Sequence, residues 1–178
     1  MSGRSQITIY ALRASPCCEQ LLIRQFDELL RLALSRICNI YLTDDEWTHA
    51  SLPVWSGGLG VRSVSMLASS AFLASAAGTL PLQTQVLQNS LAAAEDTSTS
   101  LNQWLLISGV SGDDSLPTGN HRALDSIVIN HTFQTLAENQ TAQYHQTRLL
   151  AASAAHSGDW LHAMPISACG LRLKNEAL

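Results

Sequence analysis

Apolar residues return at helical spacing along most of the chain. The clearest case follows a glycine-rich stretch, where one helix face is formed by Val64, Leu67, Ala68, Ala71 and Phe72. Intervals of three and four residues are typical of one face of a helix. The opposite face carries only small side chains, namely Ser63, Ser69, Ser70 and Ala77. We therefore predict a central helix over residues 62–77, ended by the segment from Gly78 to Pro81, with room for a neighbouring helix to approach closely.

A second strong pattern predicts a helix from Glu19 to Cys38. Its apolar stripe consists of Leu22, Phe26, Leu29, Leu30, Ala33 and Ile37. We expect this stripe to face the core, with the pairs Arg24–Glu28 and Asp27–Arg31 four residues apart on the outer face. Thr43 and Glu46 have the spacing of a capping box and predict the start of a short helix that ends near Ser51.

The remaining segments also favour helices. We expect them over residues 7–14, 82–94, 101–110, 121–139 and 141–155, with a last turn near Trp160. No stretch alternates like a strand, so the fold class is all-α: an irregular bundle of about six to eight helices with a long loop near residues 108–120. The expected division is a helical segment over residues 1–94, a flexible linker over 95–120 and a helical connector over 121–178.

Composition restricts the possible functions. Apolar residues make up 46% of the 178 residues and allow a core, whereas charged residues make up 13%, about half the usual share. Nine arginines and one lysine are scattered, and the net charge is −4. A free-standing nucleic-acid binder gathers such residues on one face, so the composition gives no independent support for that function.

Localisation signals are weak in this sequence. The segment from Ser63 to Ala94 has no charged residue, but serines, Gly78 and Pro81 interrupt it, so a buried helix is favoured over a membrane span. Residues 1–10 lack the apolar run of a signal peptide. An intracellular, reduced setting is therefore expected, with the adjacent Cys17 and Cys18 as small buried residues rather than metal ligands.

Three groups of residues could in principle carry chemistry. Gly112-Asp113-Asp114 has the composition of a magnesium-binding turn, but its serine and proline flanks indicate a solvated loop. His156, His162 and Cys169 are at best three zinc ligands without the usual close pair. Ser157, His156 and Asp159 contain the groups of a hydrolase but are neighbours in sequence, which argues against a triad. We therefore predict no catalytic residue, no metal site and no cofactor.

Three blocks of the sequence together resemble one known family. They are the ALRASPC and FDELLRLAL stretches between Tyr10 and Leu34, the Pro53-to-Ser63 segment with Gly-Gly-Leu-Gly-Val-Arg-Ser, and RLLAASAAHSGDWLHAMPISACGLRLKNEA from Arg148. In this order they resemble the region that follows the polymerase domain in reverse transcriptases of retrotransposons without long terminal repeats. The likeness covers most of the chain and is loosest over residues 82–140.

The resemblance implies a structural rather than a catalytic role. The family's metal-binding aspartates lie upstream of the matched region, and its zinc motif and nuclease lie downstream. The motif residues that carry over are Pro53, Gly57, Gly58, Gly60 and Arg62. In the parent protein this region is expected to brace the thumb against template–primer nucleic acid and to connect the polymerase with the nuclease.

Two further expectations concern packing. We expect the glycine loop to be seated against the central helix by four apolar side chains, Trp47, Trp55, Leu59 and Phe72. The alternative function is a free-standing helical interaction module, which would use the small-residue face from Ser63 to Ala77 to bind a partner helix or a second copy.

Overall fold

The computed structural model describes residues 3–17, 20–87, 92–111, 120–139 and 143–162. These residues form α-helices and one short 3₁₀ helix, and the described residues contain no strand, which confirms the all-α class. The elements are α1 (Gly3–Ala14), α2 (Leu21–Cys38), α3 (Asp44–Ser51), η1 (Val54–Ser56), α4 (Val64–Leu87), α5 (Ala92–Ser108), α6 (His121–Asn139), α7 (Gln143–Ala152) and α8 (Asp159–His162).

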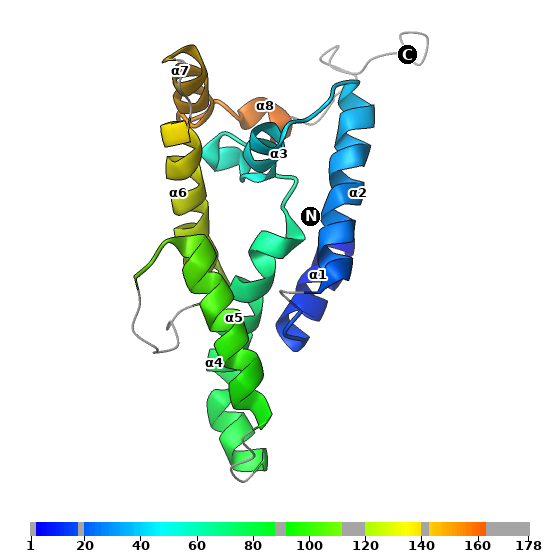
Figure 1. Ribbon diagram of the computed structural model, residues 1–178, viewed down its shortest axis with the longest axis vertical. Helices are drawn as coiled ribbons and strands as arrows, with labels where there is room; N and C mark the ends of the chain where they lie inside the picture. The colour runs from blue at the N-terminus through cyan, green and yellow to red at the C-terminus, as the bar shows by residue number, and fades with distance from the viewer. Residues whose placement is uncertain (1–2, 18–19, 88–91, 112–119, 140–142, 163–178) are drawn as a thin grey trace.

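Helix α4 is the centre of the arrangement. It packs on α1 and α2 on one side and on α5 and α6 on the other, while α3, α7 and α8 gather at one end of the molecule (Figure 1). Because α4 meets four other helices, it needs apolar or small side chains around most of its circumference. This explains why its first half carries no charged residue.

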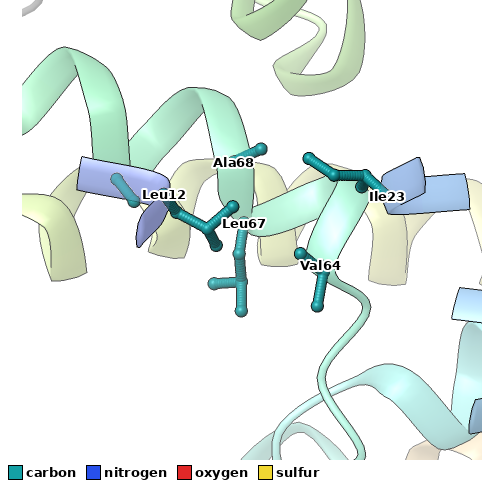
Figure 2. Packing of buried hydrophobic residues seen from close by; sticks show 6 residues of the cluster. Leu12, Ile23, Val64, Leu67 and Ala68 are labelled. Atoms are coloured by element: carbon teal, nitrogen blue, oxygen red, sulfur yellow. The ribbon is translucent and has the colours of Figure 1, made fainter. Parts of the chain in front are cut away.

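The first core lies between α1, α2 and the start of α4. Its buried residues are Leu12, Ile23, Val64, Leu67, Ala68 and Ala71, and Figure 2 shows how several of them converge. Four of the five residues predicted for this helix face are therefore buried as expected. Phe72 is only half-buried.

The second core lies on the other side of α4. Leu73 packs there against α5 and α6, in a cluster completed by Leu101, Trp104, Leu124 and Val128. Ser69 and Ser70 are fully buried, so the small-residue face is closed within the chain. Small side chains at these positions let the surrounding helices approach closely, as the sequence indicated, but the approaching helices belong to the same molecule.

Two predicted boundaries in the middle of the chain are wrong. Helix α4 continues through Gly78 and Pro81 to Leu87, so no separate helix begins at residue 82. Helix α5 already begins at Ala92, so residues 95–108 are not a flexible linker. The burial of Leu101 and Trp104 against α4 and α6 stabilises a helix where the polar composition alone suggested a loop.

The exposed Gly78 gives a direct test of the continuous α4. A Cβ at this position would meet nothing within 4 Å. Alanine loses less conformational entropy than glycine when a helix forms, so Gly78→Ala should raise the free energy of unfolding by roughly 0.5–1 kcal/mol. Urea unfolding monitored by circular dichroism measures this gain. An unchanged or lowered stability would indicate that the helix ends near Gly78.

Helix α2 confirms its predicted span but not its predicted orientation. It ends at Cys38 with Asn39 in the left-handed conformation. The buried residues of α2 are Ile23 and Asp27, whereas Leu22 is 71% exposed and Ile37 is 81% exposed. The predicted stripe therefore points largely away from the body of the molecule. Asp27 faces α4 instead of pairing with Arg31, which binds Asp44 and the Leu42 carbonyl.

One helix of the described residues is long and apolar enough to cross a membrane by length and composition. It is the segment Val64–Gln83 of α4, and 39% of its most apolar window is buried inside the fold. Core helices meet the same criterion. Several residues of this segment pack in the two cores, as expected for the buried helix that we predicted.

Candidate functional site

The five motif residues lie in and beside the loop that joins α3 to α4. Helix α3 begins at a complete capping box, in which Glu46 N donates to Thr43 Oγ1 over 3.3 Å and Thr43 N donates to Glu46 Oε2 over 2.8 Å. The Thr43 hydroxyl also donates to Glu46 Oε2 over 2.9 Å. The hydrogen bonds from the Thr43 amide and hydroxyl to the carboxylate lower the pKa of Glu46. The predicted start of α3 is therefore confirmed, and the helix delivers Leu52 and Pro53 to the loop.

The loop folds back onto the end of α3 through backbone hydrogen bonds. The Leu59 amide donates to the Ala50 carbonyl over 3.1 Å, and the Gly60 amide donates to the Leu52 carbonyl over 2.9 Å. The Gly58 amide donates to the Pro53 carbonyl over 3.1 Å. Since these three bonds tie the loop backbone to itself and to the end of α3, the loop has a defined conformation.

The three motif glycines are required for different reasons. Gly57 and Gly60 have φ values of 83° and 73°, which other residues adopt only at a cost. Gly58 does not have a positive φ. A Cβ on Gly58 would lie 2.5 Å from the Leu52 carbonyl carbon and 2.7 Å from the His49 carbonyl oxygen. Close backbone approach, not backbone strain, therefore excludes a side chain there.

The loop is anchored to α6 and α7. A third buried cluster consists of Leu52, Ile129, Leu136 and Leu149. Leu52 stands immediately before the loop and packs on the two helices through this cluster. A Cβ on Gly57 would lie 2.8 Å from the backbone of Ala152 and Ser153, so the loop also touches the end of α7.

The four apolar side chains expected to seat the loop do not all do so. Trp55 is 61% exposed and Leu59 is also exposed, while Trp47 and Phe72 are only half-buried. Instead of these four side chains, backbone hydrogen bonds and the Leu52 cluster hold the loop. A sequence pattern that records side chains alone cannot indicate this kind of anchoring.

Arg62 links the end of the loop to α6. Its Nη2 donates to Asp125 Oδ1 over 2.6 Å, and both side chains are largely buried. Burial lowers the pKa of Arg62 and raises the pKa of Asp125, and the attraction between the two charges opposes both shifts. Asp125 was missed by the sequence analysis because its partner lies 63 positions away. Arg62 thus has a structural partner and is not free to bind a ligand with its full charge.

An open pocket of about 420 Å³ lies beside the loop. Its walls bring the motif together with the segment after α7, and the lining residues are Pro53, Val54, Trp55, Gly60, Arg62, Ala154, Ala155, His156, Ser157, Gly158 and Asp159. The structure therefore places three of the five motif residues beside the only histidine–carboxylate ion pair found among the described residues.

The groups around this pocket do not form a nucleophilic site. His156 Nδ1 lies 2.9 Å from Asp159 Oδ2, so these sequence neighbours do face each other, contrary to our expectation. The Ser157 hydroxyl, however, donates to the Ala152 carbonyl and is not held by His156. Both members of the His156–Asp159 pair are exposed, and without an activated hydroxyl the arrangement lacks the central element of acyl transfer.

The other candidate groups give no metal site in the described part of the chain. No group of three or more histidine, cysteine, aspartate or glutamate side chains gathers there. Gly112-Asp113-Asp114, Cys18 and Cys169 lie outside the described residues. Cys17 is half-buried and packs against the first core, as expected for a small apolar residue.

The N-terminus of α4 is held by a carboxylate that the sequence analysis assigned to the surface. Asp27 accepts hydrogen bonds from the Ser63 hydroxyl over 2.7 Å, from the Val64 amide over 2.7 Å and from the Ser65 amide over 3.0 Å. The Ser65 hydroxyl donates to the same carboxylate over 2.5 Å. A buried anion here matches the positive end of the helix dipole. Asp27 therefore fixes α2 and the exit of the glycine loop against the central helix.

Two partly buried histidines make stability depend on pH. Burial is the largest cause that lowers the pKa of His49 and of His121, and Arg148 and Arg13 respectively add repulsion. The unfolded chain then binds more protons between the ordinary pKa of about 6.5 and the lower folded value. Stability is therefore complete above that ordinary value and falls as the pH drops through this window.

This pH dependence can be measured with one variant. Urea unfolding of the wild-type protein should show a falling free energy of unfolding from pH 7 to pH 5. His49→Gln removes one of the two groups, so we expect a shallower fall over the same range. The buried Asp125, whose pKa is raised, acts in the opposite sense at more acidic pH. A variant slope equal to the wild-type slope would contradict the role of His49.

Comparison with protein-family models, with curated proteins and with solved structures gave no match. The loop and its pocket are therefore interpreted from their own geometry and from the resemblance of the motif residues. That geometry consists of a loop backbone held by hydrogen bonds, an ion pair that joins the loop to α6, and a pocket in which the Ser157 hydroxyl is bound to a backbone carbonyl.

Proposed function

We propose that this chain is a non-catalytic helical piece derived from the post-polymerase region of a retrotransposon reverse transcriptase. Its role in the parent protein would be a structural connector between the polymerase and nuclease regions. The proposal rests on the structural roles of the motif residues. Gly57, Gly58, Gly60 and Arg62 each meet a structural requirement of one loop: the glycines through positive φ or close backbone approach, and Arg62 through its bond to Asp125.

The geometry supports a bracing role for this loop. It is tied to α3 by backbone hydrogen bonds, to α6 by the Arg62–Asp125 pair and to the end of α7 by close contact. Elements from the first and second halves of the chain therefore meet at this loop and are held there by direct contacts. A connector that transmits orientation between two flanking domains needs such contacts, because a flexible linker would let the domains move independently.

The ancestry can be tested without the protein. The DNA that flanks the coding region should encode a palm domain with paired aspartates upstream and a cysteine/histidine zinc motif followed by a nuclease downstream. Sequencing of this locus provides the test. Flanks that encode unrelated proteins, with no trace of either domain, would contradict the proposed origin.

The second candidate function, a helical interaction module, is favoured by a different observation. The small-residue face first considered for it is occupied by helices of the same chain, since Ser69 and Ser70 are fully buried. A broad apolar face instead remains exposed on α2. If the chain acts as an interaction module, this face is the surface with the required chemistry.

A further inference from the structure

Helix α2 exposes a continuous row of apolar side chains. We call this row the α2 face and define it by Leu22, Phe26, Leu29, Ala33 and Ile37, all of which are exposed. The intervals of four, three, four and four residues place them on one side of the helix. The row has the spacing of a helix–helix contact, and helix α2 carries it at the edge of the molecule (Figure 1).

The packing of α2 explains why this face is open. Ile23 and Asp27 point toward α4, and Arg31 is bound to Asp44 and to the Leu42 carbonyl. The contacts that hold α2 therefore come from a different side of the helix, adjacent to the α2 face. Exchange of the exposed side chains would leave these contacts in place, so the face can be altered without removing what holds α2.

The size of the exposed area fits a weak, reversible association of two identical chains. Four large apolar side chains of the α2 face are exposed, namely Leu22, Phe26, Leu29 and Ile37. At about 100 Å² each they offer roughly 400 Å² per copy, which places the pair among small, transient interfaces. Apolar patches of a few hundred Å² on a monomer often mark interaction sites.

We propose that two copies of the chain pair through this face, with one α2 packed antiparallel on the other about a two-fold axis near Leu29 and Leu30. In this register, position i lies opposite position 59 − i of the second copy. The large Phe26 then faces the small Ala33, and Leu22 faces Ile37. Large side chains opposite small ones allow close packing, and the antiparallel helix dipoles are favourably aligned.

The polar side chains at the rim agree with the same register. Arg36 is exposed on one flank of the α2 face, and Gln25 is exposed on the same flank nearer the start of the helix. Antiparallel pairing brings the Arg36 flank of one copy toward the Gln25 flank of the other, where the guanidinium group can donate to the amide oxygen. In a parallel pair the same flanks would lie on opposite sides of the interface. The pairing does not depend on the ancestry proposed above.

Sedimentation velocity over protein concentrations from micromolar to millimolar tests the association. We expect a reversible equilibrium between monomer and a discrete dimer. Leu29→Glu places a charge near the axis in both copies and should weaken the dimer at least about 100-fold. Leu106→Glu is the matched control, because Leu106 is similarly exposed but lies on α5. It should leave the dissociation constant unchanged.

A charge exchange tests the register. Leu22→Glu alone and Ile37→Lys alone should each weaken the dimer, because a charge then faces an apolar side chain. The double variant should recover most of the loss, because each new carboxylate faces a new ammonium group across the interface. Circular dichroism checks that all variants fold. A wild-type chain that stays monomeric, assembly without an end point, a dimer that survives Leu29→Glu or a double variant without recovery would each overturn the proposal.

Discussion

Gly58→Ala is expected to lower the free energy of unfolding by about 4 kcal/mol, one of the largest effects of any single substitution in this chain. The added Cβ would lie 2.5 Å from the Leu52 carbonyl carbon and 2.7 Å from the His49 carbonyl oxygen. Both obstacles are backbone atoms, so neither can turn away as a side chain would. Relief requires the loop to move off α3, which breaks the hydrogen bonds that the loop makes with Ala50 and Leu52.

A comparison with Gly60 separates crowding from backbone strain. Gly60 has a φ of 73°, and its nearest obstacle is a Val54 methyl group at 3.3 Å. Gly60→Ala should cost only about 1–2 kcal/mol, and Gly60→Asn should cost less because asparagine tolerates positive φ better. At Gly58, asparagine should be no better than alanine. Thermal and urea unfolding of the four variants gives the comparison, and a mild Gly58→Ala would contradict the close approach.

Asp27→Ala is expected to cost about 3 kcal/mol of stability. The substitution removes an anion that accepts from two backbone amides and two serine hydroxyls at the start of α4. Buried donors left without an acceptor, together with the lost helix cap, account for a loss of this size. The stability of Asp27→Asn should lie between those of the wild type and Asp27→Ala. The amide keeps one acceptor oxygen but presents an NH₂ group to the remaining donors.

The neighbouring acid provides the control for Asp27. Glu28 is exposed, and its closest approach to Arg31 is 3.9 Å, so Glu28→Ala should change stability by no more than about 0.5 kcal/mol. Urea unfolding of both variants, followed by circular dichroism, measures the difference. Equal losses for Asp27→Ala and Glu28→Ala would show that the carboxylate of Asp27 does not hold α4.

The sequence predicted the elements whose pattern depends on local spacing. The fold class, the span of α6, the capping box at Thr43 and the Val64 face of α4 follow from periodicity and cap chemistry, and the structure confirms them. On α6, the apolar residues Leu124, Ile127, Val128 and Leu136 have helical spacing, and Leu124, Val128 and Leu136 are buried. Ile127 is exposed and Ile129 is buried in its place, because α6 serves two separate cores rather than one stripe.

Most of the errors share one physical cause, which is contact between residues distant in sequence. Helix α5 extends through a polar stretch because Leu101 and Trp104 pack against α4 and α6, which outweighs local preference. Pro81 lies inside α4 in an exposed stretch, and long-range packing does not explain its position there. Asp27 was assigned to the surface because its hydrogen-bonding partners at the start of α4 lie more than 30 positions further along the chain. Periodicity identified the apolar stripe of α2 but could not say whether this chain covers it.

The residues of the candidate site could be predicted from the sequence, but the physical reason for each of them could not. Resemblance singled out the glycines and Arg62, while the reason for each position came from the structure. Gly58 illustrates the difference, since its φ is not positive and the carbonyl groups of Leu52 and His49 impose the requirement for glycine. A signal for Asp125 could have come from co-variation with Arg62 in related sequences, because a single sequence does not contain long-range pairing.

Primer extension tests most directly the claim that this chain is a scaffold without catalysis of its own. The purified full chain is incubated with a primed RNA template, deoxynucleotides and Mg²⁺, beside an active reverse transcriptase as the positive control. We expect no extended primer at any protein concentration, because the resemblance implies that the metal-binding aspartates of such polymerases lie upstream of the region matched by this chain. Template-dependent synthesis by the chain alone would contradict the account.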